Sequence, residues 1–596
     1  MPWFGKGKTT LRGGYQLNYV PIANADPTFG FIRVLGGATG ATYNYNMYST
    51  PETKYMRIAD LEDYLPISHF IPESISPLNV TPIESKGRSG PVSQYDPDIR
   101  NPYIHSLNMS LTRNLSSSVT LDLRYVGTLA RKSVGTININ AANWISNGLI
   151  DDFNAARRGD TTDRLDRLFE GVQFREFDWS TFGYNYYQVG DAAGTTGGDL
   201  LRTLYAENLA NGDYNAIAGD LNVYNYEVDT SPWAPMNAGL PVPGDLTQGA
   251  LLRHANTLYP GMFPENFIVA NPQVGSDMMA GDPGWISNIN QNNYHSMQAQ
   301  LTVRPTRGFN LTSTYTWSRN LGWQSYTNPN DRRNPFDYTF TSNHRAHQLS
   351  TYGSWELPFG ANGFFFRDLS SPVLRRIVEG WQLSWILNLA SGRPTDLAAG
   401  ATHLYGNSVP HLVNPDLFDP KDGKVTWDSG AREGRFFGDK YVRYADPQCF
   451  DSNLVDPGIQ GNCTMNALYI VSLDEEGNQI YDESTLVFQQ PLPGEYGNFG
   501  RNKLSGPGSF GLDMAMSKNI TLTEGKIMSI RVDAGNILNH PSPTGSFGGF
   551  TGSMQTNARE TSVVLPNLSL ASGDAFGAFL AKAQHRTFQA KISLRF

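Results

Sequence analysis

The last ten residues, Thr587 to Phe596, have the sequence TFQAKISLRF. The residues of one parity are apolar: Phe588, Ala590, Ile592, Leu594 and Phe596. The residues of the other parity are polar: Thr587, Gln589, Lys591, Ser593 and Arg595. Because side chains alternate between the two faces of a strand, this stretch predicts a β-strand with one apolar face. At roughly 3.3 Å per residue and a tilt of about 40°, Phe588 and Phe596 would lie about 20 Å apart along a membrane normal, close to the spacing of two aromatic girdles.

The composition favours many strands and turns over a helical protein. Of the 596 residues, 12% are aromatic and 17% are charged, with 59 glycines and 36 prolines. No apolar run reaches the length that a transmembrane helix needs, which excludes such a helix. A transmembrane β-barrel is compatible with the mean hydropathy of -0.38, because only every second residue of its strands meets lipid. The net charge of -9 argues against a nucleic-acid partner.

The alternation of the terminal stretch recurs along the whole chain. Segments with period-2 alternation run over residues 10–19, 107–111, 119–125, 297–303, 309–317, 346–357, 380–391, 510–516 and 528–534. Short turns are predicted at 115–118, 305–308 and 521–525, and a longer connection joins 346–357 to 380–391. These patterns predict antiparallel hairpins.

Long connections alternate with the short turns. They cover residues 20–101, 127–292, 392–508 and 539–584. The first is mostly loop, with short strands expected near 31–34 and 42–48, and the second is expected to hold short helices at 148–158, 163–171 and 200–209. In a meander all the long connections fall on one rim, as in outer-membrane barrels with short periplasmic turns and long extracellular loops. Connections of such length indicate a functional surface, so we expect 127–292 and 392–508 to form the outer ligand or partner surface.

The polar parity of these strands carries charges of both signs. They are Asp122, Arg124, Asp513, Arg531, Asp533, Lys591 and Arg595. Such residues suit a wet or plugged lumen and are costly against lipid. We therefore predict that these seven face the lumen, while Phe588, Ile592, Leu594 and Phe596 form the lipid face of the terminal membrane strand.

Motifs for catalysis or metal binding are weak in this sequence. The Gly7-Lys8-Thr9 run lacks the first glycine of a phosphate-binding loop, and the G-x-G-x-x-G match at 506–511 precedes a strand instead of a helix. His344 and His347, three residues apart, would point to opposite faces of a strand. Loop carboxylates at 416, 419, 422 and 474–476 miss the EF-hand spacing, and solvated turns are the simpler interpretation. We predict no enzyme activity, no cofactor and no metal site.

Two cysteines, Cys449 and Cys463, lie in one segment rich in Pro, Gly and Asp. Their isolation favours a loop disulfide in an oxidising compartment. Two unrelated thiols are the alternative.

Several short motifs, spread from near the first residue to the last strand, together resemble TonB-dependent receptors of the Oar-like type. The motifs are L-R-G-G-Y at 11–15, N-P-Y-I at 101–104, Y-H-S-M-Q-A-Q-L from 294, Y-T-W-S at 315–318, W-E-L-P-F-G at 355–360, G-W-Q-L-S at 380–384, S-G-R-P at 391–394 and N-I-L-N-H-P at 536–541.

This resemblance implies an all-β, antiparallel transmembrane β-barrel of 22 strands in the bacterial outer membrane. In that family an N-terminal plug fills the barrel, and import uses energy delivered through TonB. Residues 1–596 resemble the C-terminal portion of the barrel, with the plug, the TonB box and the signal peptide absent from this chain. The implied partners are outer-membrane lipid, the barrel-assembly machinery, the TonB system acting through the missing plug, and an extracellular ligand that the sequence does not identify.

The leading hypothesis is an outer-membrane receptor and transporter for TonB-dependent ligand uptake. A passive porin-like channel is the first alternative, and a surface adhesin or structural barrel is the second. If strands from a missing N-terminal part complete the barrel, residues 10–19 and 587–596 are expected to form the free edges of an open wall. A self-contained barrel would instead pair these two strands.

Overall fold

The computed structural model describes most of the chain. The described residues are 8–21, 94–138, 141–178, 180–223, 250–270, 284–323, 338–360, 363–368, 370–395, 409–423, 426–428, 433–435, 437, 440–523, 526–540, 542–543, 578–579, 582–583 and 585–595. The short strands expected near 31–34 and 42–48, and Phe596, lie outside these residues.

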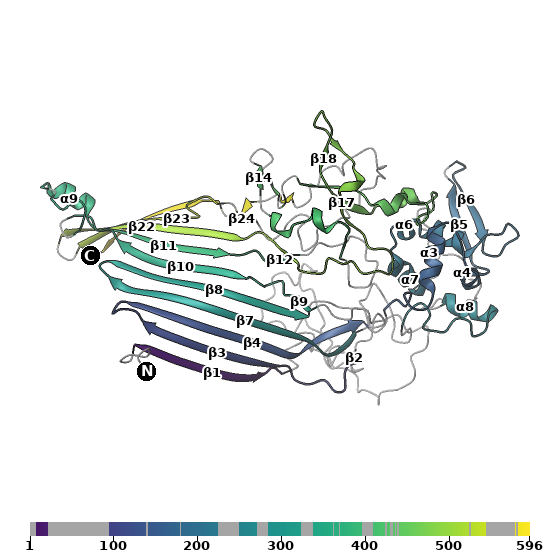
Figure 1. Ribbon diagram of the computed structural model, residues 1–596, viewed down its shortest axis with the longest axis horizontal. Helices are drawn as coiled ribbons and strands as arrows, with labels where there is room; N and C mark the ends of the chain where they lie inside the picture. Colours follow the sequence, from purple (N-terminus) through teal and green to yellow (C-terminus); the bar gives the residue numbers. More distant parts are fainter. Residues whose placement is uncertain are drawn as a thin grey trace, which may run out of the picture.

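One large antiparallel sheet, which we call the wall, organises the molecule (Figure 1). Its strands in spatial order are β1 (Thr9–Tyr19), β3 (Tyr103–Asn114), β4 (Val119–Asn138), β7 (Gly284–Thr306), β8 (Phe309–Trp323), β10 (His347–Glu356), β11 (Trp381–Ala390), β22 (Ser509–Thr523), β23 (Lys526–Gly535) and β27 (Thr587–Arg595). Two shorter strands join it, β2 (Gln94–Tyr95) beside β7 and β9 (Tyr338–Phe340) beside β8. Spatial order follows chain order, so the predicted meander is confirmed.

Each wall hairpin turns where the sequence predicts. A two-residue turn joins β7 to β8 through Arg307 and Gly308, whose φ angles are 53° and 78°. Two successive residues with positive φ match a type I′ turn, whose twist fits the twist of the flanking strands. The long connections lie at the opposite rim.

The strand registers place the apolar residues of all ten wall strands on the same face of the sheet. Ile592 faces Ile530, Trp385 faces Met514, and Leu111 faces Leu11. The register shifts lie near the short turns in β7–β8 and β22–β23, and between Ala130 and Gly135 in β4–β7, outside the alternating segments. No slip within those segments exchanges the two faces. The apolar side chains stand exposed, with Ile592 at 71% and Phe588 at 64%. Much of this face therefore has no packing partner among the residues that the structure describes.

Three Tyr–His pairs lie on the apolar face near the long-loop rim. The hydroxyls of Tyr15, Tyr125 and Tyr315 lie 2.8, 2.7 and 2.8 Å from the Nδ1 atoms of His105, His295 and His347. In each pair the residues sit diagonally on neighbouring strands, and their rings stack. The histidines on this face thus have polar partners, which lowers the cost of placing them beside an apolar medium.

The largest extensions beyond the expected bounds are those of β4 and β7. β4 continues to Asn138 and β7 begins at Gly284, although the sequence analysis placed loop over 127–292. Beyond Gly127 both parities of β4 are mixed, with Arg131 on one and Lys132 on the other. Such a segment lacks alternation because neither face has to meet an apolar medium. Irregular register shifts between Ala130 and Gly135 accompany this extension.

The sheet is open along the described residues. β1 pairs with β3 along its length, β27 pairs with β23, and no ladder joins β1 to β27 among the described strands. Thr9 of β1 and Arg595 of β27 both lie at the short-turn rim, beside Arg113 and Ile527.

Short helices gather in the connection between β4 and β7. They are α3 (Leu149–Arg157), α4 (Asp163–Phe169), α5 (Gly197–Leu204), α6 (Ala206–Ala210), α7 (Tyr214–Val223) and α8 (Ala250–Leu258). The helix expected over 200–209 is wrong in its continuity, because the chain breaks at Tyr205, whose φ and ψ of -125° and 33° are not helical. A further helix, α9 (Pro372–Val378), lies between β10 and β11. No helix in the described residues is long and apolar enough to cross a membrane.

The remaining elements are short strands and 3-10 turns in the connections. The strands are β5 (Gln173–Asp178), β6 (Gly183–Gln188), β12 (Pro394–Thr395), β13 (His411–Leu412), β14 (Thr426–Asp428), β15 (Glu433–Arg435), β16 (Tyr441–Ala445), β17 (Asn466–Ile470), β18 (Ser472–Leu473), β19 (Gln479–Ile480), β20 (Leu486–Gln489), β21 (Leu504–Ser505), β24 (Ser542–Pro543), β25 (Ala578–Phe579) and β26 (Lys582–Ala583). The 3-10 turns are η7 (Pro415–Leu417), η8 (Pro420–Asp422), η9 (Pro447–Phe450), η10 (Gln460–Asn462) and η11 (Glu483–Thr485).

Candidate ligand-binding surfaces

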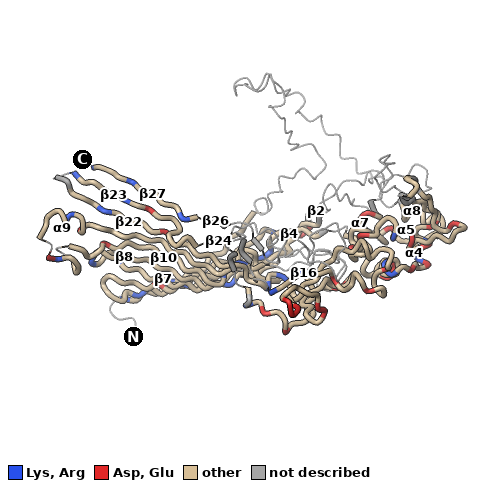
Figure 2. Tube along the Cα trace, turned by 90° about the horizontal axis from the view of Figure 1, so that it is seen from above, with Lys and Arg blue, Asp and Glu red and all other residues tan. Residues whose placement is uncertain are grey.

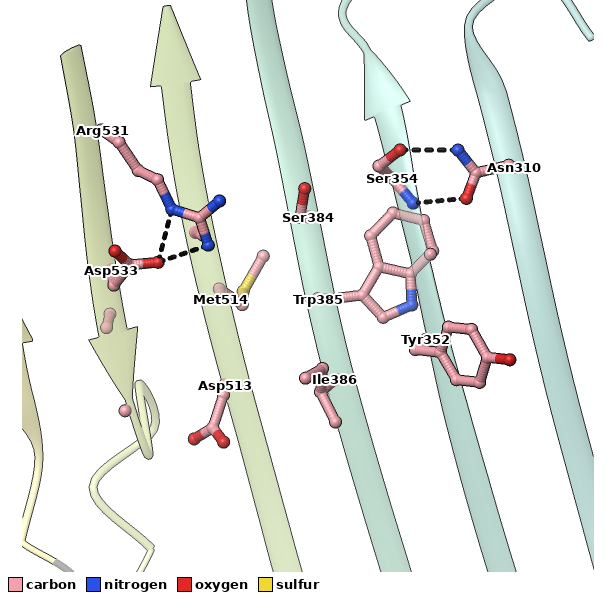
Figure 3. Close-up of a pocket in the computed structure, with 14 residues that line it drawn as sticks. Asn310, Tyr352, Ser354, Ser384, Trp385, Ile386, Asp513, Met514, Arg531 and Asp533 are labelled. Carbon is pink, nitrogen blue, oxygen red and sulfur yellow. Dashed lines mark hydrogen bonds and ion pairs between the residues drawn. The ribbon is translucent and has the colours of Figure 1, made fainter. Parts of the chain in front are cut away.

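A groove of about 530 Å³ lies on the polar face of the wall (Figure 3). Five neighbouring strands line it, from β8 through β10, β11 and β22 to β23. The side chains that enter it from the polar parity include Asn310, Tyr352, Ser354, Ser384, Ile386, Asp513, Arg531 and Asp533. The groove is therefore built from the pleat itself, because alternate residues of adjacent strands meet on the same face.

One side of the groove is charged. The Arg531 guanidinium donates to Asp533 Oδ1 at 2.7 Å from Nη2 and 2.8 Å from Nε. Asp513 Oδ1 accepts a hydrogen bond from the backbone N–H of Asn536 at 2.8 Å. The Arg531 and Asp533 side chains are 54% and 40% exposed. Because both side chains are that exposed, a ligand can reach these charges. An exposed ion pair of this kind adds at most about 1 kcal/mol to stability.

The other side combines hydroxyls, amides and apolar surface. Asn310 Nδ2 donates to Ser354 Oγ at 2.6 Å, and Gln382 Nε2 donates to the same oxygen at 3.2 Å. Tyr352 and Ile386 project from the same face and are 55% and 50% exposed. This set of groups can bind a ligand that has polar groups and an apolar part.

The second surface is built by the long connections themselves. One hydrophobic core unites residues from the β4–β7 connection with residues from the β11–β22 connection. We call this unit the cap and define it as the described residues between 141 and 270 together with 446–465. Leu149, Phe153 and Tyr214 are fully buried in it, as is Cys449 from the other connection. The cap lies at the end of the wall opposite α9 (Figures 1 and 2).

Hydrogen bonds across the cap join its two halves. The backbone N–H of Asp456 donates to the carbonyl of Arg157 at 2.7 Å, and that of Thr464 donates to Asn211 Oδ1 at 2.8 Å. Cys449 and Cys463 form a disulfide with a Cα–Cα distance of 5.6 Å. The disulfide therefore lies inside the joint core, not in an isolated loop.

Two buried charges also come from the two halves of the cap. Asp446 is 0% exposed and accepts hydrogen bonds from the backbone N–H groups of Gln490 and Gln448, at 2.7 and 3.0 Å. Burial raises the pKa of Asp446 to about 6, against the lowering effect of these hydrogen bonds. Arg157 is 2% exposed and donates to the carbonyl of Ala210 at 3.1 Å, and burial lowers its pKa. Each charge favours the ionised form of the other.

The structure places the seven charged residues of the lumen prediction on the polar face. Asp122 and Arg124 form an ion pair at 2.7 Å on β4. Asp513, Arg531 and Asp533 meet at the groove. Lys591 lies beside Arg531, and Arg595 lies beside Ile527 at the short-turn rim. Three of the seven thus gather at one site, and the other four lie elsewhere on the same face.

The groove's uncharged residues were missed by sequence reasoning. Ser354, Ser384 and Tyr352 carried a usable signal, because they occupy the parity opposite Trp355, Leu383 and Leu387. The sequence alone does not give the register between neighbouring strands, which brings residues of five strands together at the groove.

The histidine and carboxylate motifs have separate local partners. His344 precedes β10, which begins at His347, so the two histidines do not lie on one strand. His344 stacks on Phe340 at 4.3 Å and accepts from the backbone N–H of Asn320. Asp419 and Asp474 accept hydrogen bonds within their own turns. Within the described residues, no group of three or more His, Cys, Asp or Glu side chains could hold a metal ion.

Comparison with known proteins gives a family. A family model described as an outer membrane beta barrel domain matches residues 2–217 and 276–589. No curated protein matches the chain. Among solved structures, the outer membrane transporter YddB from Escherichia coli aligns at 7% identity and a TM-score of 0.25, covering 86% of this chain and 35% of that chain. The chain thus spans about a third of YddB.

Two further solved structures align more weakly. A Pseudomonas aeruginosa FadL homologue aligns at 7% identity and a TM-score of 0.16, covering 83% of this chain and 67% of that chain. The siderophore receptor PiuA from Acinetobacter baumannii aligns at 8% identity and a TM-score of 0.12, covering 85% of this chain and 68% of that chain.

Proposed function

Because this chain belongs to the outer membrane beta barrel domain family, which places it in the bacterial outer membrane, we propose that it forms part of the wall of a TonB-dependent receptor and transporter. Its role is to capture a ligand at the cell surface and pass it inward, without chemical conversion. In this proposal TonB supplies the energy for import.

The two faces of the wall suit a barrel with lipid on one side and a lumen on the other. In a barrel the apolar face of Ile592, Met516 and Leu111 meets lipid, and the polar face that carries Arg531 and Asp533 lines the lumen. The open edges at β1 and β27 call for strands beside them, because unpaired backbone groups in hydrocarbon cost several kcal/mol each. The groove then opens into the lumen.

The observation that carries the proposal is the shared core of the cap. Two connections that leave the wall at different strands meet in one hydrophobic core, with hydrogen bonds between them and a disulfide within one of them. A preorganised unit at the long-loop rim suits ligand capture, because a rigid surface loses less entropy on binding than separate loops do. With short turns on the periplasmic side, the cap stands outside the cell.

Uptake by cells that produce the full-length protein containing this chain tests the proposal. The probes are three labelled pools, short peptides, oligosaccharides and ferric chelates, applied with and without a protonophore. We expect one pool to accumulate in energised cells only. Accumulation that ignores the protonophore would instead support a passive channel, binding without accumulation would support an adhesin, and no binding of any pool would contradict ligand capture.

A matched pair of variants links uptake to the groove. Ser384→Trp places a large side chain in the groove, whereas Leu383→Trp places the same side chain on the apolar face one residue away. We expect the Ser384 variant to lose accumulation while it keeps surface binding, and the Leu383 variant to keep both. Equal uptake by the two variants would show that the ligand does not pass through the groove.

A further inference from the structure

The short-turn rim carries one connection that is not short. The chain between β10 and β11, residues 357–380, contains α9, which stands beyond the ends of the strands (Figure 1). Val373, Leu374 and Ile377 of this helix are 66%, 49% and 56% exposed. The same connection exposes three consecutive phenylalanines, Phe364, Phe365 and Phe366. Contiguous apolar exposure of this kind marks an interaction site.

Helix α9 is amphipathic by its spacing. Val373, Leu374 and Ile377 fall on one side at 100° per residue, and Arg375 and Arg376 fall on the other. The helix begins well, because Pro372 occupies its first turn and the Ser371 side chain accepts a hydrogen bond from the backbone N–H of Leu374. The exposed apolar side is thus presented by an ordered helix.

The end of α9 is fastened to the apolar side of the wall. Lys518 and Trp381 face each other on β22 and β11 and share the parity of Met516 and Leu383. Lys518 Nζ donates to the carbonyls of Ile377 and Glu379 at 2.7 and 2.6 Å and lies 4.8 Å from the Trp381 ring centroid. Trp381 Nε1 donates to the carbonyl of Ile377 at 2.9 Å.

These contacts fix the side on which α9 lies. Lys518 projects from the apolar face, yet it is only 5% exposed because the helix end and Trp381 cover it. The helix therefore extends from the outer side of the wall and not from the side of the groove. Phe309, Trp355 and Trp381 end the apolar face at this rim, and aromatic residues of this kind mark a membrane interface.

We propose that α9 is an interfacial anchor in the lipid leaflet on the short-turn side. Val373, Leu374 and Ile377 insert among acyl chains, and Arg367 and Arg376 contact the headgroups of anionic phospholipids. Lipid is the occupant because the apolar side of α9 continues the apolar face of the wall, and because the three arginines of this connection outnumber its acids, Asp368 and Glu379. The inference needs only that the apolar face meets lipid, and it holds whether or not the chain imports a ligand.

Single nitroxide labels on the full chain test this proposal. Val373→Cys and Ile377→Cys report on the apolar side of α9, Arg376→Cys on its polar side, and Ser116→Cys on a short turn at the same rim. The Cys449–Cys463 disulfide stays intact, and the vesicles contain phosphatidylethanolamine and phosphatidylglycerol. We expect the ratio of relaxation by oxygen to relaxation by an aqueous nickel chelate to be severalfold higher at 373 and 377 than at 376 and 116.

Two results would overturn the anchor. Labels at 373 and 377 that are as accessible to the nickel chelate as the label at 116 would show that the helix stands in water. Labels that are shielded from both agents would show that another protein surface covers the helix.

The headgroup contact is tested separately with Arg367→Gln combined with Arg376→Gln. In the parent chain, replacing phosphatidylglycerol with phosphatidylcholine is expected to lower the ratio at 373. In the double variant this lipid dependence should be lost, while the heat-dependent gel mobility of the folded wall stays unchanged. A parent chain that shows no lipid dependence would contradict the preference for anionic headgroups.

Discussion

The wall and the cap use apolar residues in opposite ways. In the wall Phe588 and Ile592 are 64% and 71% exposed, whereas in the cap Leu149 and Phe153 are 0% exposed. The wall alternates its apolar residues with period 2, and the cap places them on short helices that share a core. The apolar residues of the wall thus stabilise it only against a surrounding medium, and those of the cap stabilise it from within.

This difference predicts that the two regions respond to separate perturbations. Hydrogen bonds between strands and contact with lipid stabilise the wall, so the wall should stay folded when packing in the cap is lost. The cap depends on burial, on a disulfide and on buried polar groups that all lie beyond the wall strands. A substitution in one region should therefore change the stability of that region and leave the other region as a control.

The largest effect is expected from Phe153→Ala in the cap core. Truncating a fully buried phenylalanine typically costs about 3 to 5 kcal/mol. We expect the cap to become sensitive to limited proteolysis, while the heat-dependent gel mobility of the wall stays unchanged. The matched control is Phe588→Ala, on a wall residue that is 64% exposed. If both variants destabilise the cap, the two regions are not independent.

The next effect concerns the faces of β27. Ile592 lies beside Ile530 on the apolar face next to the middle of the strand, and Ser593 lies beside Ser529 on the other face. Arginine on a lipid face costs about 2 to 4 kcal/mol near the midplane. We expect Ile592→Arg to lower wall stability in denaturant titrations in lipid by this amount, and Ser593→Arg to change it little. Equal losses at both positions would refute the assignment of faces.

Removing the disulfide should affect the cap alone. Cys449 and Cys463 are 14 residues apart, and closing a loop of about 15 residues is worth roughly 3 kcal/mol in the chain-entropy model. Cys449→Ser combined with Cys463→Ser is expected to lower the free energy of unfolding of the cap by about this amount, which appears as a lower denaturant midpoint. An unchanged midpoint would show that the joint core holds these segments without the covalent link.

The smallest effect is a pH dependence at Asp446. Its folded-state pKa of about 6 lies above its ordinary value of 3.8, so folding favours the protonated form. Its contribution to cap stability is therefore fully present below pH 3.8 and is lost as the pH rises through 6. The loss amounts to at most about 3 kcal/mol, at 1.36 kcal/mol per pKa unit.

The comparison of Asp446→Asn with the parent chain isolates this contribution. We expect the variant to gain stability relative to the parent as the pH rises from 4 to 6. The measurement is cap unfolding at a series of pH values, where a constant difference between the two chains would contradict the inferred pKa.

The sequence predicted the wall well and the cap poorly, for a physical reason. A strand at an apolar interface repeats with period 2, so Leu383 and Met516 reveal their face without any knowledge of their neighbours. The cap is held by contacts between distant segments, such as Asp456 with Arg157, and no local pattern encodes these. The same reason explains why α7 and α8 were missed and why the helix over 200–209 was expected to be continuous. The groove on the wall shares this limit, because it depends on register across five strands.

Site-directed nitroxide scanning along β27 in lipid vesicles tests the two-faced wall most directly. Each residue from Phe588 to Leu594 is replaced by cysteine in turn and labelled. The account predicts relaxation by oxygen that peaks at 588, 590, 592 and 594, and relaxation by an aqueous nickel chelate that peaks at 589, 591 and 593. Accessibility with the opposite phase, or with no alternation, would contradict it.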